Sequence, residues 1–321
     1  MGARMKTIVG AMALCLLFAG VAAAADAPAP TLPFELKQIG PGVYAAIDGP
    51  QHKSGSNAGF IVGDDGVVVV DAFQTKDAAR ALLGEIKRLT PQPIRYVVNT
   101  HYHADHTGGD QVFRDAGAQI VAHRNVRGWV RAENPHLFGA RITPEMKAAI
   151  DALPLPDITT TGDLTIWLGG RKIEVRTVLG HTGGDLIVAV PDAHVVFCGD
   201  MVWNHFPPNI IDGSIKEWIV TDQALVALPD AGQTSYVPGH GDVAKAADVA
   251  ALVDYLTDLR GFTQEGLKAG LTGDALSQAV LAKLKPKYGD WNYFGAMAPR
   301  EVGFMADELS GKKRRPIPAA D

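Results

Sequence analysis

The sequence predicts one α/β domain made of two halves, and each half contains strands followed by helices. Short apolar runs of strand length alternate with stretches of helical periodicity, and the strand pattern starts again near residue 164. No low-complexity linker separates the halves. The chain of 321 residues is long enough to bury a large hydrophobic core.

Five apolar runs of the first half have the length and composition of strands: 43–47, 60–62, 67–71, 94–98 and 119–122. The sequence Gly-Asp-Asp-Gly at 63–66 is typical of a hairpin turn. A helix is predicted over 78–89, with Thr75 as its N-cap, because apolar residues recur there at helical spacing. Two further amphipathic helices are expected around 124–133 and 143–152.

The second half repeats this order, with four predicted strands: 164–168, 172–177, 186–190 and 195–198. A helix is predicted over 214–228, and Ser214 with Glu217 has the spacing of a capping box. Another helix is marked by apolar residues over 249–259. We expect the basic segment 311–321 to be a flexible tail.

Residues 1–25 have the organisation of a secretory signal peptide. A basic start precedes the apolar stretch 8–21, and the small residues 22–25 suit cleavage. We therefore expect a periplasmic or secreted protein without stable membrane insertion after cleavage. The mature catalytic domain, with its C-terminal helices, is predicted to span 26–310.

Composition limits the partners of the mature chain. The leader carries two of the 30 Lys and Arg residues and none of the 35 Asp and Glu residues, so 28 basic residues face 35 acidic ones, a formal charge of −7. This balance does not favour nucleic acid as a partner. Only Cys198 remains after cleavage, so no internal disulfide is expected, and a small buried hydrophobic role suits this thiol. The oligomeric state is left open.

The stretch NTHYHADHTGGD, at 99–110, follows an apolar strand and concentrates potential metal ligands. His101, His103, Asp105 and His106 lie within six residues. Imidazole nitrogens and carboxylate oxygens are ligands that suit zinc, and an irregular turn after a strand lets such side chains converge. The pattern predicts a metal site.

The pentad HTGGD occurs again at 181–185, and it also follows a predicted strand. Two more candidate ligands stand at strand ends, Asp200 in VVFCGD and His240 in YVPGHGD. The glycines of both pentads would permit close backbone approach near a crowded site. Because a rigid scaffold presents its loops at one edge, we expect these turns to meet.

The order H-x-H-x-D-H, then His, then Asp in a Gly-Asp turn, then His in a Gly-His-Gly turn resembles the metallo-β-lactamase superfamily, from about 43 to 242. The resemblance implies a four-layer αββα sandwich, with two mixed sheets and helices outside. It also implies two metal ions. The first would bind His101, His103 and His181, and the second Asp105, His106 and His240, with Asp200 bridging.

A pair of zinc ions would explain hydrolysis. Two divalent cations that share a water lower its pKa towards neutrality, which gives a hydroxide that attacks a carbonyl carbon. We therefore expect an amide or ester bond of a small-molecule carbonyl substrate to be opened, such as a β-lactam or lactone. Asp105 is the candidate proton carrier. Asp71 could orient a ligand histidine, although a turn-capping role suits it equally.

Residues shortly after Asp200 are candidates for the substrate pocket: Trp203, Asn204, His205 and Phe206. Asp200 holds the place that cysteine takes in many β-lactamases of the family, so the chain resembles the aspartate-bridged members instead.

Other functions fit the same ligands. A thioester hydrolase resembling glyoxalase II shares the aspartate bridge, but its substrate is cytoplasmic. Iron-dependent sulfur dioxygenases share the histidine motif, and both iron and manganese suit these ligand types. A non-enzymatic metal carrier would need no open coordination position. The nuclease branch is disfavoured by the acidic charge balance.

Overall fold

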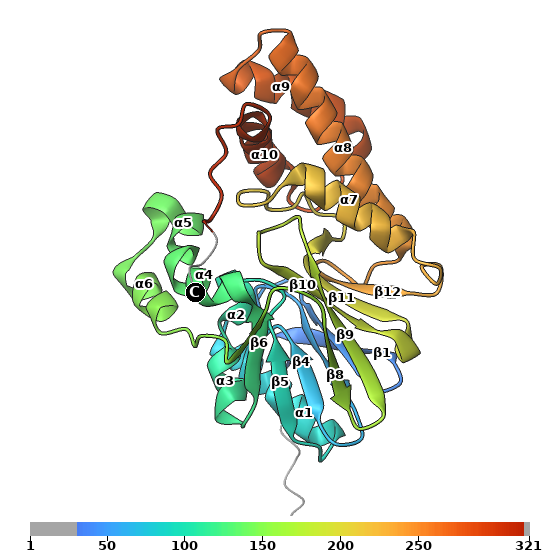
Figure 1. Cartoon of the computed structure of the whole chain (residues 1–321). Coiled ribbons are helices and arrows are strands. Elements are labelled where there is room, and N and C mark those ends of the chain that lie inside the picture. Colours follow the sequence, from blue (N-terminus) through green and yellow to red (C-terminus); the bar gives the residue numbers. More distant parts are fainter. Residues whose placement is uncertain (1–30, 318–321) are drawn as a thin grey trace, which may run out of the picture. The chain divides into compact units, whose positions relative to one another are not determined.

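The structure, a computed structural model, describes residues 31–317 and contains two mixed β-sheets (Figure 1). The predicted signal peptide and its cleavage site lie outside the described residues. None of the helices within 31–317 is long and apolar enough to span a membrane.

The first sheet has seven strands in sequence order: β1 (Phe34–Gly40), β2 (Val43–Asp48), β3 (Ala58–Val62), β4 (Val67–Val70), β5 (Ile94–Val98), β6 (Gln119–His123) and β7 (Ile158–Thr160). Strands β1 to β4 pair antiparallel, and β4 to β7 pair parallel. The hairpin predicted at 63–66 joins β3 to β4, where the Gly63 N–H donates to the Gly66 carbonyl at 2.9 Å.

The parallel part of this sheet needs crossover connections, and helices supply them. Helix α1 (Lys76–Leu89) joins β4 to β5, and its predicted N-cap is confirmed, because Thr75 Oγ1 accepts the Ala78 N–H at 3.2 Å. The other crossovers contain short helices: α2 (Ala104–Thr107), α3 (Asp110–Asp115), α4 (Arg124–Ala132), α5 (Asn134–Phe138), η1 (Gly139–Arg141) and α6 (Pro144–Asp151).

The second sheet has the order β12-β11-β10-β9-β8. Its strands are β8 (Leu164–Leu168), β9 (Arg171–Val178), β10 (Asp185–Val190), β11 (Val195–Trp203) and β12 (Ser235–His240), and the short η2 (Pro191–Ala193) joins β10 to β11. Only β11 and β12 pair parallel. Helix α7 (Ile215–Val226) connects them, and three helices follow: α8 (Ala246–Lys268), α9 (Gly273–Tyr288) and α10 (Phe294–Leu309).

Three apolar clusters hold the layers together. Buried residues of both sheets, such as Val68 and Val188, form the central one. The outer face of the first sheet packs on α1 and α3, and that of the second packs on α7 to α10. The αββα sandwich predicted from the resemblance is therefore confirmed.

The capping box predicted at the start of α7 is not formed. Ser214 occupies the N-cap position, but its side chain makes no capping hydrogen bond. Instead, the Ile215 N–H donates to Glu308 Oε1 of α10 at 2.9 Å. A carboxylate at a helix N-terminus satisfies a free backbone donor and complements the helix dipole. Because Glu308 is distant in sequence, the local pattern could not reveal it.

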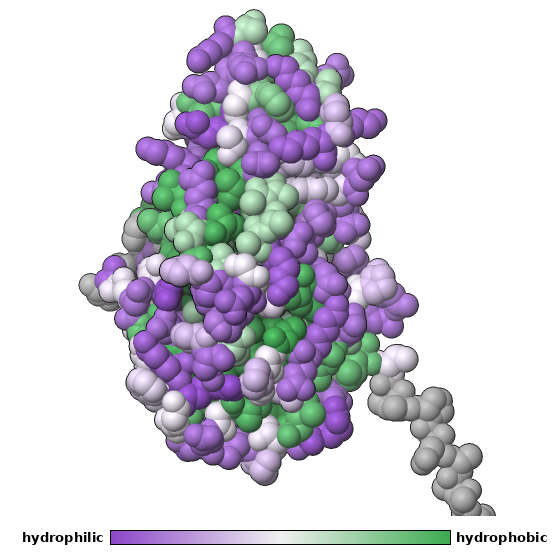
Figure 2. Space-filling view, turned by 90° about the vertical axis from the view of Figure 1, so that its right-hand side faces the viewer, coloured by the Kyte–Doolittle hydropathy of each residue, from purple (hydrophilic) through white to green (hydrophobic). Residues whose placement is uncertain are grey.

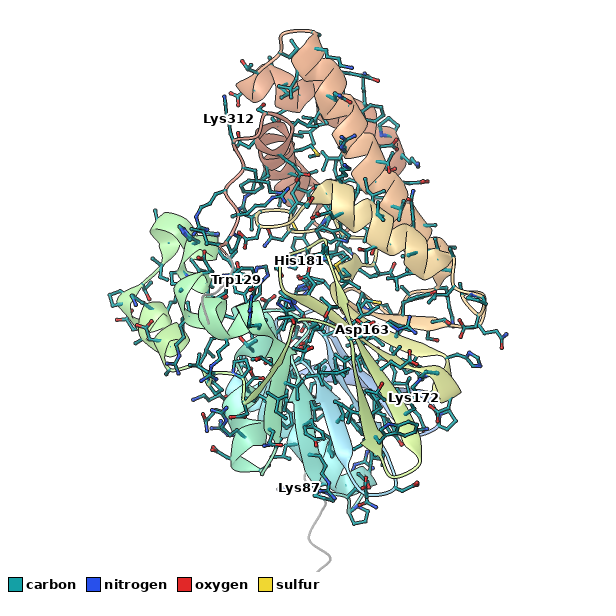
Figure 3. All side chains as sticks on the ribbon, viewed as in Figure 1. Lys87, Trp129, Asp163, Lys172, His181 and Lys312 are labelled. Atoms are coloured by element: carbon teal, nitrogen blue, oxygen red, sulfur yellow. The ribbon has the colours of Figure 1, made fainter. Side chains whose placement is uncertain are left out.

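The described part of the basic tail contacts the domain. Lys313 Nζ lies 2.9 Å from Glu308 Oε2, and the Arg314 guanidinium lies 2.7 Å from the Glu133 carboxylate. The Trp129 indole N–H of α4 donates to the Ile317 carbonyl at 2.6 Å. Figure 3 shows Lys312 near α10 and Trp129 on α4. The flexibility of 311–321 stays a prediction.

The view in Figure 2 shows a largely hydrophilic face with hydrophobic residues in patches between the polar ones. Several large apolar side chains of the described residues are exposed, and Trp167 and Val220 are 60% and 61% accessible. They lie far apart in sequence, on β8 and α7.

Candidate metal centre

The predicted ligands lie where strands of both sheets end. His101, His103, Asp105 and His106 follow β5, and the last two lie on α2. His181 lies in the β9–β10 loop, and His240 is the last residue of β12. Asp200 was expected at a strand end, but it lies within β11, which continues to Trp203. His181 lies where the helical part meets the sheets (Figure 3). The structure brings all seven predicted side chains together in two adjoining groups.

The two HTGGD pentads have different conformations, but in each of them the glycines allow another segment of the chain to come close. The first runs from the end of α2 to the start of α3, and a Cβ on Gly108 or Gly109 would lie 2.0 or 2.2 Å from the carbonyl oxygens of Gln74 and Ala72. The second is a loop between strands, where a Cβ on Gly184 would lie 3.2 Å from His123 Nδ1. The first pair of glycines is therefore under the tighter steric limit.

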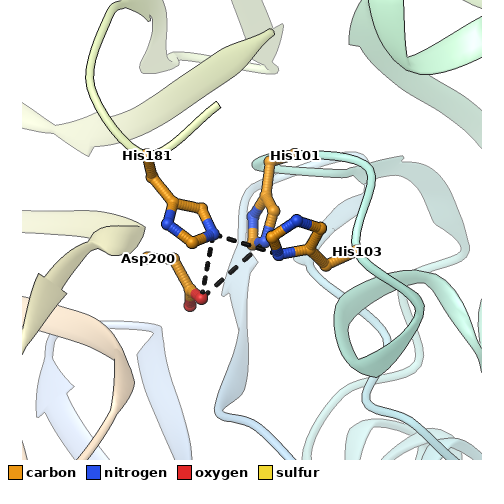
Figure 4. A group of neighbouring side chains, drawn as sticks. All are labelled: His101, His103, His181 and Asp200. Carbon is orange, nitrogen blue, oxygen red and sulfur yellow. Dashed lines mark hydrogen bonds and ion pairs between the residues drawn. The ribbon is translucent and has the colours of Figure 1, made fainter. Parts of the chain in front are cut away.

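The first group contains His101, His103, His181 and Asp200, all buried (Figure 4). His181 Nε2 lies 3.0 Å from His103 Nδ1 and 3.2 Å from Asp200 Oδ2. His101 Nε2 lies 3.8 Å from the same carboxylate oxygen. Three ring nitrogens and one oxygen thus face a common point, which is the donor set of a tetrahedral zinc site.

The second group contains Asp105, His106 and His240. Asp105 Oδ2 lies 3.7 Å from His106 Nε2 and 3.4 Å from His240 Nε2. Both rings also face Asp200, whose Oδ1 lies 3.0 Å from His106 Nε2 and 3.5 Å from His240 Nε2. The two Asp200 oxygens therefore face different groups, as a bridging ligand requires.

These residues fit divalent cations because their inward-facing atoms have no other partner. His101 Nε2, His106 Nε2, His240 Nε2 and Asp200 Oδ1 are buried, and none makes a hydrogen bond. Buried polar atoms are rarely left unpaired, because desolvation without a partner costs about 1–3 kcal/mol each. Cations between the groups would satisfy these four atoms together.

The shifted pKa values of histidines in the cluster also indicate a metal site. Burial and the neighbouring His106 hold the pKa of His101 well below its usual value. Burial opposes protonation of His106 as well, but the carboxylates of Asp200, Asp105 and Asp71 raise its pKa well above the usual value. Without metal, histidine protons would thus compensate part of the carboxylate charge. Metal binding would displace those protons.

Hydrogen bonds behind the rings fix which nitrogen faces inward. His106 Nδ1 lies 2.8 Å from Asp71 Oδ2, as predicted for a carboxylate that orients a ligand histidine. Thr100 Oγ1 donates to the same oxygen and lies 3.0 Å from His101 Nδ1. With Nδ1 occupied as a donor, Nε2 of each ring keeps its lone pair for a metal.

Asp212 supports His103 in the same way, although its sequence context did not predict this role. Its Oδ2 lies 3.4 Å from His103 Nε2 and also accepts the Tyr102 hydroxyl, which leaves His103 Nδ1 facing the cluster. Asp212 lies in the loop after β11, without a ligand motif around it. The neighbouring Gly213 is the only local hint of a crowded position. A Cβ on this residue would lie 2.1 Å from the Gly180 carbonyl oxygen.

Two cavities give access to the cluster. One of about 240 Å³ is bordered by His103, Asp105, Asp200 and His240. An open cleft of about 890 Å³ borders His240 from the side of α10. Trp203 lines both, and its ring contacts that of His240 in a tilted arrangement, with centroids 4.0 Å apart and planes at 30°.

The other predicted pocket residues take varied places. Phe206 lines the open cleft, but Asn204 and His205 line neither cavity. Asn204 Nδ2 donates to the Asp242 carbonyl at 2.9 Å, and His205 is exposed beside Trp291. Their role in substrate binding stays a prediction. Cys198 is free and buried, as expected.

The chain is similar to several known proteins. It is 28% identical to the hydroxyacylglutathione hydrolase of Shewanella pealeana over 56% of each chain. It is also 28% identical to the 2,4-dinitroanisole O-demethylase subunit beta of a Nocardioides species, over 76% of this chain and 72% of the relative. The chain thus spans only about half the length of the first relative.

Among solved structures, a metallo-β-lactamase from Pontibacter korlensis has the same fold. It is 24% identical, with a TM-score of 0.57, and the match covers 70% of this chain and 99% of that one. The profile of the metallo-β-lactamase superfamily matches residues 53–253, which include every predicted ligand. The chain therefore belongs to the metallo-β-lactamase superfamily of metal-dependent hydrolases.

Proposed function

We propose that this protein is an exported hydrolase that holds two zinc ions and opens an amide or ester bond of a small carbonyl compound. The observation that carries the proposal is the position of Asp200, with one oxygen towards each group of ligands. A single-metal site has no need for the second group. Family membership supports metal-dependent hydrolysis in general.

The residues divide between the two ions by distance. His101, His103 and His181 would hold the first, Asp105, His106 and His240 the second, and Asp200 both. Nitrogen and carboxylate ligands suit zinc, and iron and manganese are the alternatives. When bound, such ions lower the pKa of a coordinated water and polarise a carbonyl oxygen.

Asp105 is the residue best placed to move a proton. It borders the cavity of about 240 Å³, and 30% of its side chain is exposed, compared with 2% for Asp200. A carboxylate that contacts both the cluster and the cavity can take a proton from attacking water and pass it to the leaving group. The aromatic wall of Trp203, Phe206 and Tyr293 in the larger cleft would bind an apolar part of the substrate.

The test is a parallel activity screen of the metal-loaded chain with a chromogenic β-lactam, a lactone and a thioester, with and without chelator. We expect at least one carbonyl substrate to be hydrolysed, and chelator to abolish the activity. His103→Ala and Asp200→Ala should remove it too, whereas His194→Ala, an exposed histidine paired with Asp230, should not. Equal rates in the ligand variants and the unchanged chain would refute the proposal. N-terminal sequencing of the exported protein should show cleavage near Ala25.

Thioester hydrolysis is the second candidate, because the Shewanella relative is named hydroxyacylglutathione hydrolase. The same ligand cluster would serve both reactions, so the screen separates them by substrate. Metal analysis of protein purified without added metal, together with oxygen uptake, tests the sulfur dioxygenase alternative.

A further inference from the structure

A third cavity, which we call the side cavity, adjoins the cavity over the cluster. It has a volume of about 200 Å³ and lies between the loop after β11, α10 and the α5–η1 segment. Leu137, Trp203 and Asn209 line both cavities. A substrate that places its reacting bond at the cluster could therefore extend into the side cavity.

Two residues that line the side cavity each hold a buried polar atom without a partner. Trp203 is 6% exposed, and its indole Nε1 makes no hydrogen bond. Glu301 is 2% exposed, and its Oε1 is also unpaired, while the Tyr255 hydroxyl donates to Oε2. Two lining residues with unpaired polar atoms indicate a polar ligand at this cavity.

The other polar side chains of the side cavity offer hydrogen-bond donors. Arg141 and Arg300 line it, are exposed, and form no ion pair with any residue of 31–317. Asn209 Oδ1 accepts the Ile211 N–H at 3.2 Å, which leaves the amide NH₂ group as a further donor. An anion is the ligand that such a set of donors selects.

The one acidic residue of the wall does not oppose an anion at neutral pH. Burial raises the pKa of Glu301 to about 8, against the opposing effects of the Tyr255 hydrogen bond and the Arg300 charge. A mostly protonated carboxyl can donate to an anion instead of repelling it. The two guanidinium groups then determine the charge of the side cavity.

We propose that the side cavity binds a carboxylate of the substrate while the cluster acts on a carbonyl group of the same molecule, an inference that rests on the proposed hydrolase function. A guanidinium group matches the two carboxylate oxygens in a bidentate pair. The Trp203 N–H supplies a further donor next to His240. The preferred substrates would thus be esters or amides with a second, free carboxylate.

A matched pair of substrates tests this specificity: the 4-nitrophenyl monoester of glutaric acid and the same ester with a terminal carboxamide. The metal-loaded chain should prefer the carboxylate by about tenfold or more in kcat/KM, since hydrogen bonds to charged groups contribute that much. Spontaneous hydrolysis is subtracted from enzyme-free controls.

Substitutions test which residues cause the preference for the carboxylate ester. Arg141→Gln with Arg300→Gln should raise KM for the carboxylate ester and leave the carboxamide ester within about twofold. Trp203→Phe keeps the ring on His240 but removes the N–H, so it should reduce the preference in part. Arg80→Gln, on the exposed face of α1, is the matched control. A preference that the double variant retains, or hydrolysis of both esters at equal rates by the unchanged chain, would overturn the assignment.

Binding of free glutarate separates this inference from the proposed function. Calorimetry on the full chain after metal removal measures the affinity of the side cavity for glutarate, because no metal is then present to bind the carboxylate. We expect binding that weakens about tenfold in the double variant and not in Arg80→Gln. If neither ester is hydrolysed but glutarate binds in this way, hydrolysis of such esters is refuted and the carboxylate site stands. If the unchanged chain does not bind glutarate, the site is refuted whatever the activity.

Discussion

Asp71 Oδ2 lies 2.8 Å from His106 Nδ1, and the other Asp71 oxygen accepts the Thr100 N–H at 2.8 Å. One carboxylate thus connects the end of β4 with the histidine-rich segment after β5. Asp71 also adopts a positive φ of 57°, a conformation that few side chains favour and that aspartate tolerates. This geometry ties the orientation of a ligand ring to the sheet itself.

Asp71→Asn should weaken binding of the second metal ion by about 10–100-fold, because the amide holds the His106 ring less firmly and lowers its basicity. Competition with a chelating indicator measures the affinity. Asp65→Asn, in the exposed hairpin, is the control. An affinity equal to that of the unchanged chain would show that Asp71 only caps its turn.

Asp212→Asn should affect the first metal ion instead. The carboxylate faces His103 Nε2 and the Tyr102 hydroxyl, so its loss should lower the affinity of that site by about 10–100-fold. Both variants are dialysed against dilute chelator, and the number of metal ions that each retains is measured. Comparison of Asp212→Asn with Asp71→Asn shows which site is weakened. A loss of both ions in equal measure would contradict separate support of the two sites.

Metal removal should destabilise the folded chain. Ligand binding at 100 times its Kd stabilises by about 2.7 kcal/mol, which corresponds to about 4–5 °C in Tm for a domain of this size. Thermal unfolding with zinc and with chelator measures the shift. His181→Ala should shrink it, whereas His194→Ala should leave it in place. An identical Tm in both solutions would argue against a structured metal site.

Stability should fall as pH rises from about 4.5 to about 8 through the titration of Glu301. Because burial raises its folded pKa to about 8 from 4.5, the folded state binds more protons than the unfolded state across this window. The contribution is complete below pH 4.5 and lost above pH 8. Glu301→Gln stays neutral, so the variant should lose less stability between pH 5 and 9. Urea unfolding of metal-free protein at both pH values checks this, and parallel losses would contradict it.

Glu308→Ala should destabilise the fold by about 0.5–2 kcal/mol, because it removes the acceptor of the Ile215 N–H at the start of α7. Ser214→Ala should have little effect, since the Ser214 side chain makes no capping bond. Chemical denaturation compares the two. A larger loss of stability in Ser214→Ala than in Glu308→Ala would instead support the capping box that the sequence suggests.

Features whose residues are neighbours in the sequence could be predicted from it. Four of the ligand residues lie in the segment that directly follows the apolar strand β5, so their spacing alone brings His101 and His103 to a sheet edge. The hairpin at 63–66 and the Thr75 cap are likewise local. The edge strands β1 and β7 were missed, because their exposed residues weaken the apolar signal.

Residues whose partners are distant in sequence could not be predicted. Asp212 meets His103 across 109 residues, and Glu308 meets Ile215 across 93. The side cavity likewise combines Arg141 with Arg300, from segments without any shared motif. Such pairs depend on how segments distant in sequence pack against one another, which no local pattern contains.

The ligands come from the ends of both sheets, and this has a consequence for how the protein matures. Neither β-layer alone supplies a complete donor set, since His101 and His106 belong to one layer and His181, Asp200 and His240 to the other. A newly translated or half-assembled chain would hold cations only weakly. Tight metal retention would therefore report that the two layers have docked, and it would serve as a simple readout of complete folding.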